Sequence, residues 1–164
     1  ASDVYKRQAM IRIPVTVELA SEFRYMNPIL DEHTLVVVIT QSGETADSLA
    51  ALRLANERGA KTISIVNVKG SSIARESDYV LYTHAGPEIA VASTKAFSVQ
   101  CAGMYLIALK LAEVNNLMTD EQMKDFCDKF EQAIGTVEEV LKMDDYIKGI
   151  SETVSYTHLT LPTT

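Results

Sequence analysis

The segment Thr40-Gln41-Ser42-Gly43-Glu44-Thr45 gathers hydroxyl and amide side chains around one glycine, where an apolar run ends and a helical pattern begins. The free N–H groups of a helix's first turn point outward at such a place, and the helix dipole favours an anion there. Gly43 permits a tight turn close to a ligand. The segment therefore predicts a phosphate site without the lysine of the nucleotide P-loop. The alternative interpretation is that Ser42 or Thr45 only caps the helix.

A second segment of small residues and hydroxyls, Val91-Ala92-Ser93-Thr94-Lys95, also opens a helical pattern. By itself it favours an ordinary helix cap. Two such helix openings in one parallel sheet would lie together at the carboxyl ends of the strands, which favours one shared anion site.

Other chemistry-bearing residues are scattered. His33, His84 and His158 have no metal-ligand spacing, so we expect no metal site. Neither a G-x-S-x-G elbow nor a G-x-G-x-x-G loop occurs. Cys101 and Cys127 lie in apolar patterns and are interpreted as core residues. The sequence thus predicts no catalytic residue and no cofactor in this chain.

The elements that must position these segments alternate between strand and helix. Strands are expected at residues 15–19, 35–39, 62–66 and 78–82, and a helix at 45–58 that stops at Gly59. The β-branched run at 35–39 is typical of a strand buried on both faces. This spacing predicts an α/β fold, a parallel sheet with helices on both faces in three αβα layers.

Two further helices follow. Residues 93–115 are apolar almost all round, which predicts a helix buried against the sheet or a partner subunit. Thr119 with Gln122 fits a capping box at the start of the next helix. That helix carries an apolar stripe of Met123, Phe126, Cys127, Phe130, Ile134, Val137 and Leu141.

The composition bounds the class of protein. A length of 164 residues predicts one domain, and a net charge of −7 argues against general nucleic-acid binding. No long uncharged apolar run is visible, so we expect no membrane span, and two cysteines suit a reducing, cytoplasmic setting. Residues 1–9 and 154–164 fit no element and look like non-native adapter sequence.

Four motifs occur in order: ASEFRY at residues 20–25, QSGETADS at 41–48, NV at 67–68 with SSIARESD at 71–78, and EIAVASTKAF at 88–97. Together they resemble the glucosamine-6-phosphate synthases, also called glutamine–fructose-6-phosphate aminotransferases (isomerizing). The resemblance is to the first of their two sugar-isomerase (SIS) domains, a flavodoxin-like or Rossmann-like parallel-sheet fold. It makes residues 10–153 a partial SIS domain with its C-terminal helices, truncated at its N-terminus.

The resemblance implies a function for the parent protein, the synthesis of glucosamine 6-phosphate from fructose 6-phosphate and glutamine for UDP-N-acetylglucosamine. It implies that fructose 6-phosphate is bound by Thr40, Gln41, Ser42, Gly43, Thr45, Val91 and Ser93, the valine through its backbone. Thr40 departs from the family, which usually has serine there. The glutaminase domain and the second SIS domain with its catalytic groups are absent, so the fragment should be inactive. The parent should be a homodimer.

The resemblance also implies that a strand preceding Ile13 in the chain is missing. In the family's sheet that strand lies between the 15–19 and 35–39 strands, so the 15–19 strand should be displaced or poorly packed. Two other functions are left open. One is a sugar-phosphate-sensing regulatory domain, and the other is a different sugar-phosphate isomerase.

Overall fold

The computed structural model describes residues 11–87 and 95–155. The chain divides into two compact units, residues 1–117 and 118–164. The first unit contains a β-sheet with its helices, and the described part of the second contains two helices.

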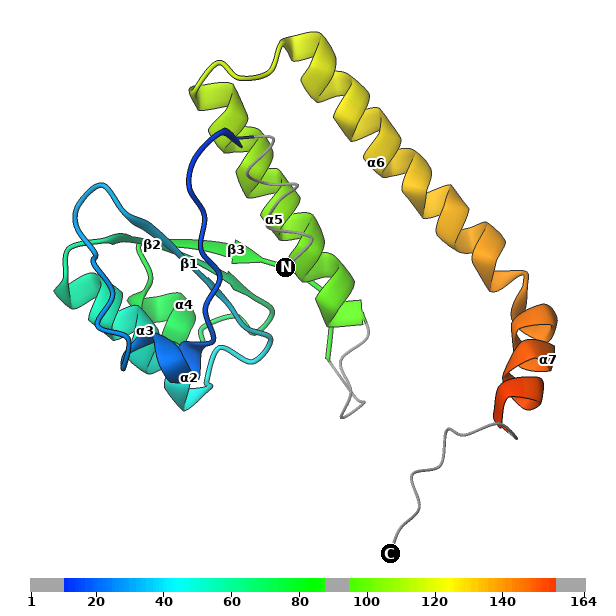
Figure 1. Ribbon diagram of the computed structural model, residues 1–164, viewed down its shortest axis with the longest axis horizontal. Helices are drawn as coiled ribbons and strands as arrows, with labels where there is room; N and C mark the ends of the chain where they lie inside the picture. The colour runs from blue at the N-terminus through cyan, green and yellow to red at the C-terminus, as the bar shows by residue number, and fades with distance from the viewer. Residues whose placement is uncertain (1–10, 88–94, 156–164) are drawn as a thin grey trace, which may run out of the picture. The chain divides into compact units, whose positions relative to one another are not determined.

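The sheet of the first unit has three parallel strands within the described residues, in the order β1 (Leu35–Ile39), β2 (Lys61–Val66) and β3 (Tyr79–Tyr82) (Figure 1). Valine and isoleucine make up most of β1 and half of β2, and tyrosines form both ends of β3. Branched and aromatic side chains both suit a pleated surface. Helix α3 (Ala46–Glu57) connects β1 to β2, and α4 (Ser72–Glu76) connects β2 to β3. The predicted strands at 35–39, 62–66 and 78–82 are confirmed. So is the helix before Gly59, which has a φ of +79°.

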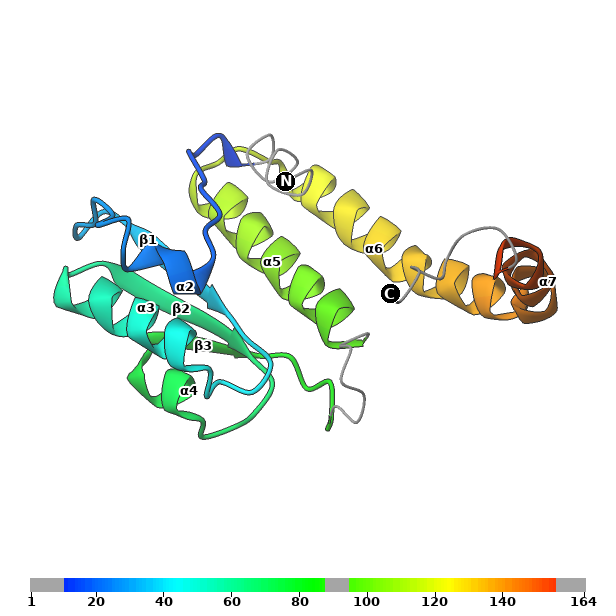
Figure 2. The same ribbon diagram turned by 60° about the horizontal axis from the view of Figure 1, so that its bottom comes forward.

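Helices cover both faces of this sheet. Val38 of β1 packs with Leu52 of α3 and Ile73 of α4, and all three are buried. The opposite face carries α5 (Lys95–Val114), where Gly103 lies over Ile65 and Leu81. Figures 1 and 2 show α3 and α4 on one side of the strands and α5 on the other. The αβα layering predicted from the sequence is confirmed.

Helix α5 buries small residues, of which Gly103 lies against the sheet. Ala96, Gly103, Ala108 and Ala112 are its buried positions. Its large residues include Phe97, Leu106 and Val114, which are 67%, 55% and 66% exposed. Burial on nearly every face, as the sequence suggested, is therefore not reached within this unit. By length and composition alone α5 would suffice to cross a membrane, a test that core helices of soluble proteins also pass.

The strand predicted at residues 15–19 is wrong. This segment has neither helix nor strand geometry, and it leads into the short helix α2 (Ala20–Phe23). Among the described residues, only β2 pairs with β1, so the other edge of β1 has no strand partner there. The expectation that this segment packs poorly is confirmed, since Val17 and Leu19 are each 65% exposed.

The described residues of the second unit form α6 (Asp120–Leu141) and α7 (Asp144–Ser155). The predicted capping box is present. The Thr119 hydroxyl accepts a hydrogen bond from the Gln122 N–H at 3.2 Å, and the Gln122 side chain accepts one from the Thr119 N–H at 2.9 Å. The apolar stripe of α6 faces solvent in this unit, with Ile134 61% and Val137 59% exposed.

Candidate functional site

The loop between β1 and α3 starts at Thr40, which is 7% exposed. Its N–H donates to the Ile65 carbonyl at 3.0 Å, which continues the β1–β2 ladder by one residue. Its hydroxyl accepts a hydrogen bond from the Gly43 N–H at 3.2 Å. The Gln41 carbonyl accepts one from the Asn67 N–H at 3.1 Å. Thr40 therefore closes the loop on itself, and Gln41 ties it to the end of β2.

Gly43 is required by both backbone angle and space. Its φ of +69° lies in the left-handed region, which a side chain disfavours. A Cβ built there would lie 2.1 Å from the Ser71 hydroxyl oxygen and 2.8 Å from a Val66 methyl carbon. Its carbonyl accepts a hydrogen bond from the Ile73 N–H at 3.1 Å. The loop backbone thus packs directly on the start of α4.

Ser42 and Thr45 lie on either side of this glycine turn. The Ser42 hydroxyl accepts a hydrogen bond from the Glu44 N–H at 3.2 Å, and its residue is half-buried. Thr45 occupies the N-cap position of α3 with extended backbone, but its side chain makes no capping hydrogen bond. Neither hydroxyl is used by the first turn of α3 in the way that the capping interpretation requires.

Glu44, to which the sequence analysis assigned no role, connects the loop to α4. Its Oε1 accepts a hydrogen bond from the Ser72 N–H at 2.7 Å. This backbone hydrogen bond is the main reason that the pKa of Glu44 lies below its usual value, and the Arg75 guanidinium adds a smaller favourable charge. The sequence signal was an acidic residue inside an otherwise neutral, hydroxyl-rich loop.

Asn67 is a second organising residue that sequence reasoning missed. Its Oδ1 accepts hydrogen bonds from the Thr83 hydroxyl at 3.1 Å and from the Ala85 N–H at 2.9 Å. Its Nδ2 donates to the Gly86 carbonyl at 2.7 Å. Through Asn67 the chain after β3 is held at the same sheet edge as the 40–45 loop. Val91 and Ser93 lie outside the described residues, but the chain leading to them starts at this edge.

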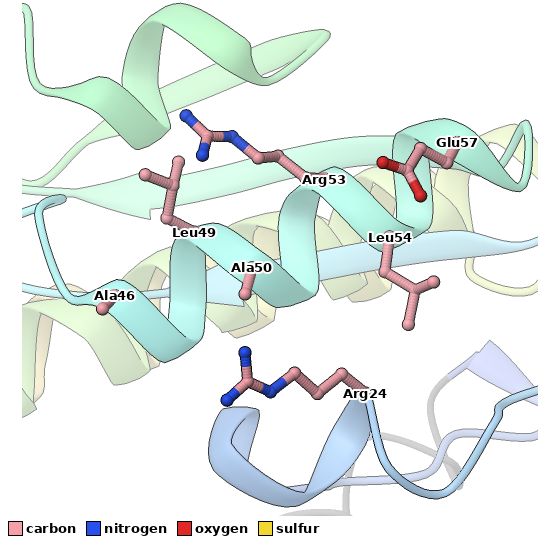
Figure 3. Close-up of a pocket in the computed structure, with 7 residues that line it drawn as sticks. All are labelled: Arg24, Ala46, Leu49, Ala50, Arg53, Leu54 and Glu57. Carbon is pink, nitrogen blue, oxygen red and sulfur yellow. The ribbon is translucent and has the colours of Figure 1, made fainter.

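A groove lies along α3, next to the end of α2 (Figure 3). It is lined by Arg24, Ala46, Leu49, Ala50, Arg53, Leu54 and Glu57. Arg53 is held by two 2.7 Å hydrogen bonds to Glu76, and Arg24 lies 3.8 Å from an Asp47 carboxylate oxygen. Because both cations already face carboxylates, the groove is a weaker anion site than the 40–45 loop.

A parallel sheet with a hydroxyl-rich turn at the carboxyl end of a strand defines a class of α/β ligand-binding domains. The family model of the SIS domain matches residues 5–110, and the chain belongs to the SIS domain family.

Relatives with curated names are similar over most of this chain. The glutamine–fructose-6-phosphate aminotransferase (isomerizing) of Clostridium tetani is 48% identical over 155 residues, covering 94% of this chain and 25% of its own length. The protein with the same name from Streptomyces coelicolor is 49% identical over 157 residues, covering 96% of this chain and 26% of its own. The chain thus spans about a quarter of the length of these relatives.

A solved structure, the C-terminal domain of glucosamine-fructose-6-phosphate aminotransferase from Francisella tularensis, is similar with a TM-score of 0.89 and 38% sequence identity. The similarity covers 94% of this chain and 44% of that chain. The resemblance stated from the motifs is therefore confirmed at the level of sequence and fold.

Proposed function

We propose that this chain is the fructose 6-phosphate-binding SIS segment of a glutamine–fructose-6-phosphate aminotransferase (isomerizing). The observation that carries the proposal is the 40–45 loop at the carboxyl edge of β1. There Ser42 and Thr45 carry hydroxyls that do not cap α3, and Gly43 lets the loop backbone pack on Ser71 and Val66. The proposed contacts are Thr40, Gln41, Ser42, Gly43, Thr45, Val91 and Ser93.

The geometry supports different roles for the three hydroxyls of the loop. A hydroxyl that accepts one hydrogen bond keeps its own proton for donation. The buried Thr40 hydroxyl accepts a hydrogen bond from the Gly43 N–H, so its main role is to stabilise the turn. Ser42 and Thr45 are more exposed and can donate to phosphate oxygens, together with the N–H groups of the first turn of α3.

The wider proposal concerns the intact enzyme that contains this segment. It would be a cytoplasmic homodimer that makes glucosamine 6-phosphate from fructose 6-phosphate and glutamine. The exposed Phe97, Leu106 and Val114 of α5 support an association surface, because burying apolar side chains against a second copy removes them from water. In this proposal residues 10–153 form the SIS segment with its C-terminal helices.

The test is Ser42→Ala in the intact enzyme. Losing one hydrogen bond to a charged group costs about 1.5–3 kcal/mol, so the dissociation constant of fructose 6-phosphate should rise at least tenfold. Isothermal titration calorimetry measures it directly. Ser151→Ala is the control, because the Ser151 hydroxyl donates to the Lys148 carbonyl of its own helix, α7, in the second unit. A dissociation constant unchanged by Ser42→Ala would refute the assigned site.

A further inference from the structure

Glu44 is an acidic residue within the loop that is proposed to bind a phosphate. A carboxylate beside a phosphate is repelled by it, so an acidic residue should weaken the site. In the structure the Glu44 carboxylate is instead occupied by α4, where it accepts the 2.7 Å hydrogen bond from the Ser72 N–H. Arg75 of the same helix lies near enough to lower the pKa of Glu44 further. The negative charge is therefore engaged outside the loop.

Three consecutive residues at the start of α4 hold this loop. Ser71 packs against the bare Cα of Gly43, the Ser72 N–H donates to the Glu44 carboxylate, and the Ile73 N–H donates to the Gly43 carbonyl at 3.1 Å. The first N–H groups of a helix have no partner within the helix. Two of them in α4 are satisfied by the loop, which couples the helix start to the curvature of residues 43–44.

We propose, building on the proposed function, that Glu44 is a positioning residue for the phosphate site. Its side chain fixes the loop against α4, and this contact holds the Ser42 and Thr45 hydroxyls and the first turn of α3 at the curvature that phosphate requires. Glu44 touches no ligand in this arrangement. It acts through the loop backbone.

Two variants of the intact enzyme test the contact itself. Glu44→Ala removes the acceptor, and the dissociation constant of fructose 6-phosphate should rise about tenfold. Glu44→Gln keeps an oxygen that can accept from the Ser72 N–H, so binding should stay within about threefold of the unaltered enzyme. If Glu44→Ala does not fold, Glu44→Asp serves the same purpose. The aspartate side chain is one methylene shorter, so its carboxylate lies farther from the Ser72 N–H.

Glu76→Ala is the matched control. Glu76 anchors the other end of α4 through its paired hydrogen bonds with Arg53, away from the loop. It should lower the melting temperature at least as much as Glu44→Ala while leaving the dissociation constant within about twofold. Equal weakening of binding by both variants, or failure of Glu44→Gln to restore it, would overturn the positioning role.

Ser42→Ala separates this inference from the proposed function. If Ser42→Ala weakens binding and Glu44→Ala does not, the site stands and the positioning role is wrong. If neither variant changes binding, the proposed site fails and the positioning role fails with it.

Discussion

Gly43 combines a left-handed backbone with direct contact to Ser71 and Val66. Gly43→Ala should therefore destabilise the protein in two ways, through the disfavoured φ and through overlap of the new methyl group with its neighbours. Together these should lower the free energy of unfolding by roughly 2–4 kcal/mol. Urea unfolding of the intact enzyme measures the change in the free energy of unfolding. Hydrogen exchange at residues 40–45 then reports whether the change is local to this loop.

Gly59 is the matched control position for Gly43. It shares a positive φ, but an added Cβ there would meet nothing within 4 Å. Gly59→Ala should cost only the backbone term, about 1–2 kcal/mol. If the two substitutions lower the free energy of unfolding equally, the contact between Gly43 and α4 contributes nothing measurable to stability.

At the scale of elements, the contact of α5 with the sheet depends on Gly103. A Cβ there would already lie 3.1 Å from a Leu81 methyl and 3.3 Å from an Ile65 methyl. Gly103→Leu should therefore push the helix off β2 and β3 and destabilise the protein by about 1–3 kcal/mol, despite the better helix propensity of leucine. The melting temperature of the intact enzyme reports this change.

Gly135 is the matched position in α6, since an added Cβ there would meet nothing within 4 Å in the described structure. Gly135→Leu should leave stability unchanged or raise it by up to about 1 kcal/mol through helix propensity. A melting temperature that Gly103→Leu does not lower would contradict close packing of α5 on the sheet.

At the scale of the whole molecule, the 164-residue chain leaves apolar surface uncovered. β1 forms an edge of the sheet within the described residues, and its Leu35 and Ile39 are 38% and 43% exposed. An uncharged, β-branched edge strand is a template for association. Expressed by itself, the chain should aggregate or melt without a cooperative transition, because typical domains are stable by only about 5–15 kcal/mol.

Light scattering and thermal unfolding of the isolated chain check this prediction. A soluble monomer that unfolds sharply, with slow amide exchange at Leu35–Ile39, would show that the edge is protected. The same measurements on the intact enzyme supply the comparison, since there the additional chain length can cover the edge.

Local pattern was enough to predict much of this protein. The β-branched runs at 35–39 and 62–66, the helix ending before Gly59 and the Thr119 capping box all depend on interactions between near neighbours in the chain, and each is confirmed. The motif around Ser42 was likewise visible, because a strand end, a glycine and a helix start are adjacent in sequence.

Tertiary structure decided the rest, because its contacts join residues far apart in the chain. Residues 15–19 alternate like a strand, yet in the described structure they pair with no strand, although one edge of β1 is unpaired there. Alternation alone therefore does not decide whether a segment joins a sheet, because β propensity depends on the tertiary surroundings. Glu44 and Ser72 are 28 positions apart, and Asn67 and Gly86 are 19 apart. The sequence by itself determined which residues could form a phosphate loop. Only the packing of β2, α4 and the β3 exit around that loop determined what holds it in place.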